Sequence, residues 1–310
     1  MTTQNRIKAS RRAFISTSML AVGATMLPHL SAGATTGTRA RKSRFTLWQL
    51  PLHQTATQGN SYVFRTDNGQ IVVMDGGMPS EAEYLRGFLA MLGNSVEAWF
   101  ISHPHIDHIG ALNEFLKSPG EIRIKTVYHS PLSEEFYNKV EPDNRNITDE
   151  FYKNLKKTGI QVVDITAPGL TVDIDRVTFK ILAVKNEEFT NNAYNNSSMV
   201  VKVWDAARSA VFLGDAGVEE GKKIMNSSLF DEYNCDFLQM AHHGQNGVNR
   251  DFYRAVKFNA CLWPTPLWLW NNDPGTGYNT GKWNTVETRK WMDEIGIKKH
   301  FVAAEGLCVI

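Results

Sequence analysis

His103-Pro104-His105-Ile106-Asp107-His108 brings three imidazoles and one carboxylate into six residues. Neutral imidazoles and carboxylates are the usual protein ligands of zinc and related divalent metals. His103 and His105 stand two residues apart, so an extended chain would point both side chains to the same side. Asp107 and His108 follow where the chain turns, and they can face a second metal position. The stretch therefore predicts a metal site, and the alternative is a polar surface loop that is rich in histidine by chance.

The flanking sequence places this stretch between a strand and a helix. Residues 96–102 form the apolar run of a buried strand, and residues 109–117 have the apolar spacing of a helix. An α/β sheet tends to place its active site at such a junction. Because a metal motif needs this context and a random loop does not, the context favours the metal site.

The stretch resembles the His-x-His-x-Asp-His motif of the metallo-β-lactamase-fold hydrolases, and the resemblance extends over about residues 44–310. Within that superfamily, the chain is most similar to the branch that includes the extracytoplasmic hydrolase domain of bacterial DNA-uptake (competence) channels. The resemblance implies an α/β fold, the αββα sandwich, in which two packed mixed β-sheets are flanked by helices. The matching segments are Asp75-Gly76-Gly77, Ser102–Gly110, Asn195-Asn196-Ser197-Ser198, Gly214-Asp215-Ala216 and His242-His243-Gly244.

The resemblance also implies a site with two divalent metal ions, for which zinc is the first expectation and manganese the alternative. His103 and His105 are expected to bind one metal. Asp107 and His108 are expected to bind the other. Asp215 is expected to bridge both, because the two oxygens of a carboxylate can serve two cations. Asp107 could also orient the nucleophile or carry a proton, so Asp107 and Asp215 are the candidate catalytic residues.

Three further residues are assigned around these ligands. One of the adjacent His242 and His243 is expected to complete the second metal site. We expect His242 to be the ligand, because it leaves the strand expected at 236–241 first, and His243 to support it or to face the substrate. The opposite assignment remains open. Asp75 is expected to support the ligand loops without touching metal.

The sequence departs from the family at one position. Many members carry a further metal-binding histidine before the bridging aspartate. The only histidine between residues 110 and 215 is His129, which ends the strand expected at 123–129 and comes too early. Fewer nitrogen ligands would favour a harder ion such as manganese. In the expected place, Asn196 and Ser198 could hydrogen-bond substrate or could simply form the loop before a strand.

The remaining pattern predicts strands and helices in alternation on both sides of the motif. Residues 264–283 contain Trp268, Trp270, Tyr278 and Trp283, which could roof the site or pack a long loop onto the fold. Strands are expected at 45–50, 61–66, 70–74, 177–184, 199–204, 210–213 and 299–303 in addition to those above, and helices at 80–92, 217–227 and 284–295, with two more within 131–159.

Composition excludes some classes of partner. The chain has 310 residues, of which 42% are hydrophobic, and its 33 basic and 32 acidic residues leave a net charge of +1. This balance gives no electrostatic footprint for nucleic acid or an anionic membrane. Cys235, Cys261 and Cys308 form no Cys-x-x-Cys pair, so we expect buried thiols, although one bridge could form in an oxidising compartment.

Residues 1–34 have the features of an export signal. A basic segment precedes an apolar stretch, and Ser31–Ala34 offers small residues for cleavage. Ser10–Ile15 contains Arg11-Arg12 and resembles the twin-arginine signal, and an ordinary secretory signal is the alternative. Residues 35–43 predict a linker, and 44–310 the hydrolase domain. The apolar stretch is interrupted and too short for a membrane span, so a periplasmic or secreted protein is expected, with the twin-arginine machinery as export partner.

Together these features predict an exported hydrolase that uses a metal-activated water or hydroxide. The likeness to the DNA-uptake branch favours a phosphodiester, and near-neutral charge favours a small one over nucleic acid. A lactone, a β-lactam and a carboxylic ester remain chemically open. A non-catalytic metal-binding protein of the same fold is a further alternative, which the presence of Asp107, His108, Asp215 and His242 disfavours.

Overall fold

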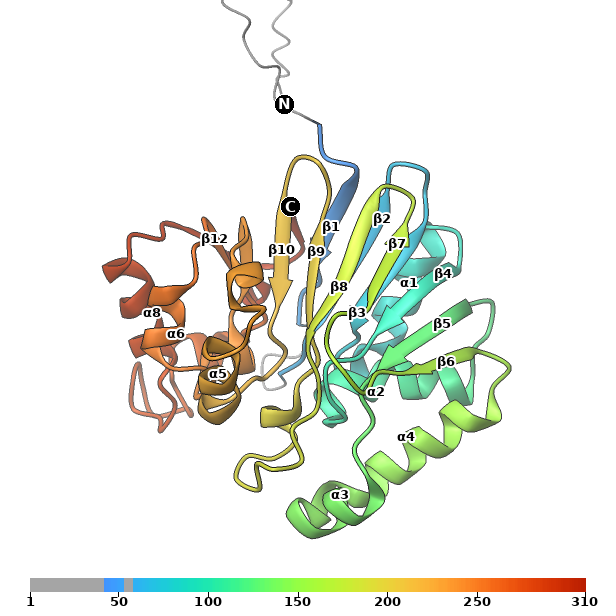
Figure 1. The fold of residues 1–310 in the computed structure, drawn as a ribbon, viewed down its shortest axis with the longest axis horizontal. Helices are drawn as coiled ribbons and strands as arrows, with labels where there is room; N and C mark the ends of the chain where they lie inside the picture. Colours follow the sequence, from blue (N-terminus) through green and yellow to red (C-terminus); the bar gives the residue numbers. More distant parts are fainter. Residues whose placement is uncertain (1–41, 53–57) are drawn as a thin grey trace, which may run out of the picture. The chain divides into compact units, whose positions relative to one another are not determined.

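Two seven-stranded sheets, packed face to face, form the centre of the structure (Figure 1). The computed structural model describes residues 42–52 and 58–310, all within the unit Ala40–Ile310. The signal segment expected at 1–34 therefore lies outside the described residues, as does the expected linker up to residue 41. The predicted sandwich of two mixed sheets flanked by helices is confirmed.

The first sheet has the order β14-β1-β2-β3-β4-β5-β6. Its first strands pair antiparallel, whereas β3 to β6 run parallel to one another. The strands are β1 (Phe45–Gln49), β2 (Ser61–Thr66), β3 (Ile71–Asp75), β4 (Ser95–Phe100), β5 (Arg123–His129), β6 (Gln161–Asp164) and β14 (Cys308–Val309).

The second sheet also has a parallel half and an antiparallel half, and its strand order is β13-β12-β11-β10-β9-β8-β7. Here β10 to β13 run parallel, and β7 to β10 pair antiparallel. The strands are β7 (Thr171–Ile174), β8 (Val177–Ala183), β9 (Val200–Trp204), β10 (Ser209–Phe212), β11 (Phe237–Gln239), β12 (Ala260–Trp263) and β13 (Lys299–Val302).

Helices cover the outer face of each sheet. The first sheet packs against α1 (Ala82–Met91), α2 (Ile106–Lys117) and α4 (Arg145–Lys157), with α3 (Glu134–Val140) before α4 at the lower right of Figure 1. The second packs against α5 (Val218–Met225), α6 (Arg250–Ala255) and α8 (Thr285–Glu294), and the short α7 (Leu267–Trp270) precedes α8.

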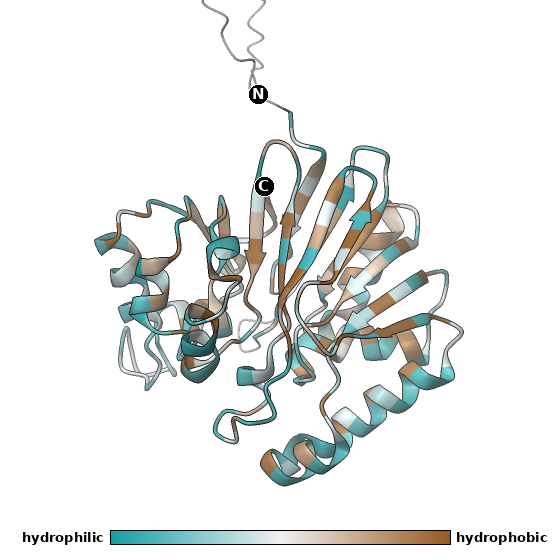
Figure 2. Cartoon of the chain, in the orientation of Figure 1, coloured by the Kyte–Doolittle hydropathy of each residue, from teal (hydrophilic) through white to brown (hydrophobic). Residues whose placement is uncertain are grey.

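The core between the sheets is rich in aromatic side chains. Phe64 and Phe100 of the first sheet meet Phe179 of the second, with ring centroids 5.6 and 5.3 Å apart. All three rings are fully buried, and each such side chain contributes about 1.5–3 kcal/mol through the removal of apolar surface from water. Figure 2 shows the corresponding pattern, with hydrophobic colour concentrated in the strands and hydrophilic colour on the outer helix faces.

Several element boundaries differ from the sequence-based expectation. Helix α2 begins at Ile106 and not at residue 109, so Asp107 and His108 lie in its first turn and not in a connecting turn. The aromatic region 264–283 was expected to be a loop, but it contains α7. Four short strands and α6 were not expected, because strands of two to four residues and a helix of six residues give too little periodicity to detect. The four strands are β6, β7, β12 and β14.

The described residues contain no helix long and apolar enough to cross a membrane. Cys235, Cys261 and Cys308 are free thiols. Cys261 is buried, whereas Cys235 and Cys308 are partly exposed, so the expectation of three buried thiols is wrong for these two.

Gly110 allows α2 to approach the 3-10 turn Pro79–Glu81 very closely. A Cβ atom at Gly110 would lie 2.4 Å from the Pro79 backbone nitrogen and 2.7 Å from the Met78 carbonyl carbon. Backbone atoms cannot move aside cheaply, so we expect Gly110→Ala to lower the free energy of unfolding by about 1–3 kcal/mol. Urea titration measures this change.

Gly87→Ala is the matched control, because Gly87 is an exposed helical glycine with no heavy atom within 4 Å of an added Cβ. It should raise the free energy of unfolding by about 0.5–1 kcal/mol. Equal effects of the two substitutions would contradict the close approach.

Candidate metal centre

The candidate site lies where the parallel halves of both sheets end. Asp75 ends β3, and the segment after β4 leads through His103 into the first turn of α2. From the other sheet, Asp215 follows β10, and a turn after β11 carries His242 and His243. The carboxyl ends of neighbouring parallel strands meet at one edge of a sheet, which is why segments far apart in sequence converge here.

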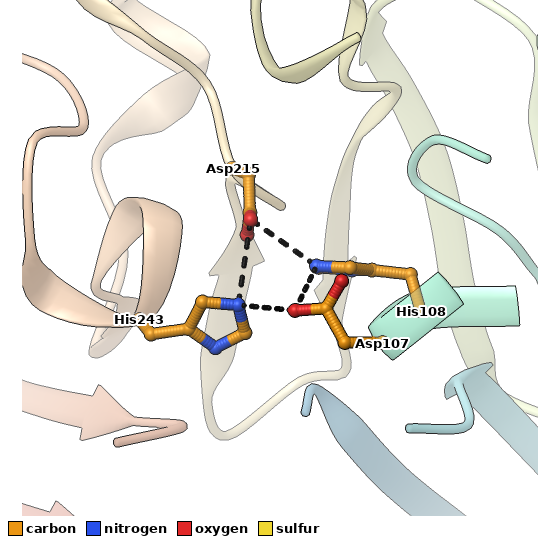
Figure 3. A group of neighbouring side chains, drawn as sticks. All are labelled: Asp107, His108, Asp215 and His243. Atoms are coloured by element: carbon orange, nitrogen blue, oxygen red, sulfur yellow. Dashed lines mark hydrogen bonds and ion pairs between the residues drawn. The ribbon is translucent and has the colours of Figure 1, made fainter. Parts of the chain in front are cut away.

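Asp107, His108, Asp215 and His243 form a buried cluster whose candidate ligand atoms all lie within 4.8 Å of one another (Figure 3). Asp215 Oδ2 is 3.2 Å from His108 Nε2 and 3.4 Å from His243 Nε2. Asp107 Oδ2 is 2.9 Å from His243 Nε2 and 3.8 Å from His108 Nε2. Two carboxylates and two imidazoles therefore point at one common position.

His103 and His105 form a second pair of ligand-type side chains. His103 Nε2 lies 2.9 Å from His105 Nδ1 and 3.9 Å from Asp215 Oδ2. Two nitrogen ligands of one tetrahedral zinc ion stand about 3.3 Å apart, so this pair fits a single cation. Asp215 Oδ2 therefore faces His103 of this pair as well as His108 and His243 of the cluster, as a bridging carboxylate would.

Asp75 connects three of the segments around the site through hydrogen bonds to its buried carboxylate. Its carboxylate accepts hydrogen bonds from the Ser102 backbone N–H (2.7 Å), Asn60 Nδ2 (2.7 Å) and His108 Nδ1 (2.9 Å). The bond from His108 Nδ1–H leaves the lone pair on Nε2, which faces the cluster. Asp75 thus orients His108 and is not itself in the group of four.

The adjacent histidines His242 and His243 occupy different positions. Both adopt left-handed backbone angles, with φ of 52° and 54°. His243 Nδ1–H donates to the Pro264 carbonyl at 2.9 Å, so its Nε2 faces Asp107 and Asp215. His242 Nε2 lies 3.9 Å from Asp215 Oδ2, and it contacts the side-chain amide of Gln245 at 2.9 Å. The tighter cluster therefore contains His243, which we had expected to support the ligand or to face the substrate, and not His242, which we had expected to be the ligand.

The charges of the cluster depend on one another. Burial lowers the pKa of His243, but Asp215 and Asp107 outweigh this effect and raise it to about 10. Burial raises the pKa of Asp215, but His108 and His243 outweigh it, so the pKa lies well below its usual value. Burial lowers the pKa of His242, which is therefore neutral near pH 7. The two carboxylates thus need positive charge beside them, which imidazolium groups or a metal cation can supply.

Asn196 and Ser198 are fully buried, and their side chains form hydrogen bonds with the backbone of neighbouring segments. Asn196 Oδ1 accepts from the Glu220 backbone N–H at 3.1 Å, and its Nδ2 donates to the Asn191 carbonyl at 2.9 Å. Ser198 Oγ accepts from the Asp215 backbone N–H at 3.0 Å. Because neither side chain reaches solvent, the geometry favours a supporting role over a contact with substrate.

Glu141 is a site residue that the sequence analysis missed. It lies between α3 and α4, and its Oε2 is 2.8 Å from His105 Nε2. Burial raises the pKa of Glu141, but the contact with His105 and the hydrogen bonds from Tyr194 and Asn144 together outweigh burial and hold the pKa below its usual value. Glu141 lies 36 residues from His105 and shares no motif with it, so no local sequence signal could have identified it.

The aromatic rings of residues 264–283 pack against their own neighbours. The rings of Trp268 and Trp283 meet edge to face at 4.7 Å, and Trp270 meets Trp263 at 5.2 Å. Tyr278 is 61% exposed. The contacts of Trp268, Trp270 and Trp283 therefore agree with the expectation that these rings pack the region onto the fold, and not with the expectation that they roof the site.

Unpartnered atoms support a cation at this site. Asp215 Oδ1 is buried without a hydrogen-bond partner, and His108 Nε2 has an ion-pair contact with Asp215 Oδ2 at 3.2 Å but no hydrogen bond. A buried polar atom without a partner costs about 1–3 kcal/mol, which a bound cation or water would recover. Imidazole nitrogen and carboxylate oxygen are donors that zinc and manganese both accept. The residues present therefore fit a divalent metal.

Comparisons with known proteins agree with this fold. The sequence profile of the metallo-beta-lactamase superfamily matches residues 54–257. The metallo-beta-lactamase fold protein YhfI from Bacillus subtilis superposes with a TM-score of 0.53 and 14% identity, over 87% of this chain and 100% of that chain. A mutant of CmlA beta-hydroxylase superposes with a TM-score of 0.53 and 12% identity, over 87% of this chain and 54% of that chain. No curated protein matches the sequence.

The two adjacent histidines should differ in their effect on metal binding. His243→Ala removes a nitrogen that lies within 3.4 Å of two carboxylates. The loss of metal affinity should exceed the about 10- to 100-fold loss typical of residues that only orient ligands. His242→Ala should have a smaller effect. Metal content after dialysis, measured by mass spectrometry of the elements, tests both variants, and the reverse order would restore His242 as the ligand.

Proposed function

The chain belongs to the metallo-beta-lactamase superfamily, whose members are usually metal-dependent hydrolases, and we propose that it hydrolyses a small phosphodiester with the help of two divalent cations. The observation that carries the proposal is the cluster of Asp107, His108, Asp215 and His243 around one position. Zinc is the first expectation for the metal, and manganese is the alternative.

We assign the ligands from the geometry of the side chains. Asp107, His108 and His243 would hold one cation, and His103 and His105 the other. Asp215 would serve both, because its Oδ2 lies within 3.9 Å of nitrogens in each group. His242 lies at the same distance from this oxygen as His103, and it could bind or orient substrate.

Cations at these positions would lower the pKa of a water molecule toward neutrality and polarise a substrate oxygen. Asp107 would orient the attacking water in this proposal. Burial raises the pKa of Asp107, but His108 and His243 outweigh burial and hold the pKa below its usual value, so the carboxylate stays ionised and can accept a hydrogen bond from that water. Asp215, which is more deeply buried, would bind both cations and hold them in position.

The resemblance of the motifs to those of the DNA-uptake branch favours a phosphodiester. No lysine or arginine in the described parts of the chain bonds to any of the candidate ligands, so the cations would have to neutralise the negative charge of such a substrate. The chain's net charge of +1 supports a small substrate over a nucleic acid.

Fold likeness alone does not decide the chemistry, since one fold hosts many activities. One structure of the same fold, for example, is named a beta-hydroxylase. The competing activities are the hydrolysis of a lactone, a β-lactam or a carboxylic ester. The competing class is a metal-binding protein without turnover.

We also propose that the protein is exported and acts in the periplasm or outside the cell. The support is the sequence Ser10–Ile15 with its adjacent Arg11 and Arg12, followed by an apolar stretch and a segment of small residues. Export of a folded chain would allow the metal to be loaded before the membrane is crossed.

The hydrolase proposal is tested with bis(p-nitrophenyl) phosphate and a measurement of bound metal. Wild type should bind close to two metal ions and release p-nitrophenol. Asp215→Ala should lose metal and at least about 100-fold in rate, as expected when reacting atoms are no longer held in position. The control Asp231→Ala changes an exposed aspartate that has no hydrogen bond or ion pair with the candidate ligands among the described residues, and it should leave both quantities unchanged.

The outcomes separate the alternatives. Bound metal without turnover of the phosphodiester would direct the search to esters, lactones and β-lactams. Failure to bind zinc or manganese under any loading condition would overturn the proposal.

The export proposal is tested by replacing Arg11 and Arg12 with lysines. Twin-arginine export depends on both guanidinium groups, so the double variant should accumulate in the cytoplasm while the wild type reaches the periplasm. Cell fractionation followed by immunoblotting measures the distribution. Unchanged export of the double variant would favour an ordinary secretory signal.

A further inference from the structure

The helical segment between β5 and β6 brings a carboxylate to one candidate ligand. This segment consists of α3, the 3-10 turn Pro142–Asn144 and α4. Glu141, at the corner after α3, places Oε2 2.8 Å from His105 Nε2. The other nitrogen of the same ring, His105 Nδ1, lies 2.9 Å from His103 Nε2. The imidazole of His105 is therefore held between the helical segment and the candidate metal position.

The carboxylate of Glu141 determines which ring nitrogen of neutral His105 carries the hydrogen. A neutral imidazole has one N–H donor and one lone pair, and a carboxylate can only accept. His105 must therefore carry its hydrogen on Nε2, toward Glu141, which leaves the lone pair on Nδ1. A metal binds the lone pair of neutral imidazole, so the carboxylate selects the tautomer in which Nδ1 is available.

Glu141 is itself fixed in place. Its Oε1 accepts from the Tyr194 backbone N–H at 2.8 Å, and Oε2 also accepts from Asn144 Nδ2 at 2.9 Å. The Tyr194 ring stacks on the His105 ring, with centroids 5.0 Å apart and an angle of 27° between the planes. The Tyr194 hydroxyl is 3.0 Å from Thr148 Oγ1 of α4. The helical segment thus contacts the same tyrosine that covers His105.

We propose that Glu141 is a positioning residue for metal binding, which fixes the tautomer and orientation of His105 and makes the helical segment 134–157 part of the metal site. The inference rests on the proposed function to the extent that His105 binds a cation. It predicts an effect on one metal position only, because Asp107, His108, Asp215 and His243 have no contact with Glu141 among the described interactions.

The test compares Glu141→Gln with Glu135→Gln. Both substitutions remove one carboxylate charge, but Glu135 is exposed on α3 and lies away from the site. Zinc affinity is measured for each metal equivalent by competition with a chromophoric chelator. We expect Glu141→Gln to weaken one of two zinc equivalents by about 10- to 100-fold and to leave the other unchanged. Glu135→Gln should match wild type at both.

A second readout reports on the tautomer directly. In ¹⁵N NMR of the metal-free protein, His105 should show a protonated Nε2 in wild type. A mixture of tautomers should appear in Glu141→Gln, whose amide can donate as well as accept. Thermal unfolding of both metal-free variants shows whether the helical segment remains folded, because a general loss of stability would affect both metal equivalents.

The outcomes are distinguishable. Two unchanged zinc affinities in Glu141→Gln would overturn this inference and leave the proposed function intact. Equal weakening of both equivalents would also overturn it, since the effect would then come from general destabilisation. Failure of wild type to bind zinc or manganese would remove the proposed function and, with it, the role of Glu141.

Discussion

Burial of negative charge is the constraint on which the rest of this structure depends. Asp75, Asp107 and Asp215 are all buried at one end of the sandwich. A buried carboxylate is tolerated only when charges or hydrogen bonds replace the water it has lost. Asp75 accepts hydrogen bonds from Asn60, the Ser102 backbone and His108 Nδ1, whereas the Oδ2 atoms of Asp107 and Asp215 face the Nε2 atoms of His108 and His243. A site that gathers two carboxylates and imidazole lone pairs around one position is chemically suited to a cation.

The fold supplies this arrangement because parallel strands from both sheets end at the same place. Each sheet has a parallel half, and the segments after β3, β4, β10 and β11 leave those halves toward a common region. Close backbone approach is part of the arrangement. Gly214 has a φ of 56°, and a Cβ there would lie 2.8 Å from the Ser102 side chain, so the two sheets meet through a residue without a side chain.

The chain departs from its superfamily at the position of the expected middle histidine, and the structure accounts for the residues found there. Asn196 and Ser198 bond to the backbone near Glu220 and Asp215 and so hold the bridging candidate in place. On the opposite side, the helical segment that carries Glu141 holds His105. Support for the candidate ligands therefore comes from Asn196 and Ser198 on one side and from Glu141 on the other, as well as from the motif residues themselves.

The sequence by itself indicated the αββα class through its resemblance to a known family, and local motifs identified the residues of the metal motif and the segments that converge on it. It also indicated Asp75 and Asp215, which belong to short Gly-containing motifs at strand ends. Only the tertiary structure separated His242 from His243 and joined Glu141 to His105. Adjacent residues share the same sequence context, and a pair 36 residues apart shares none, so side-chain direction and long-range contact were decided by packing of the folded chain.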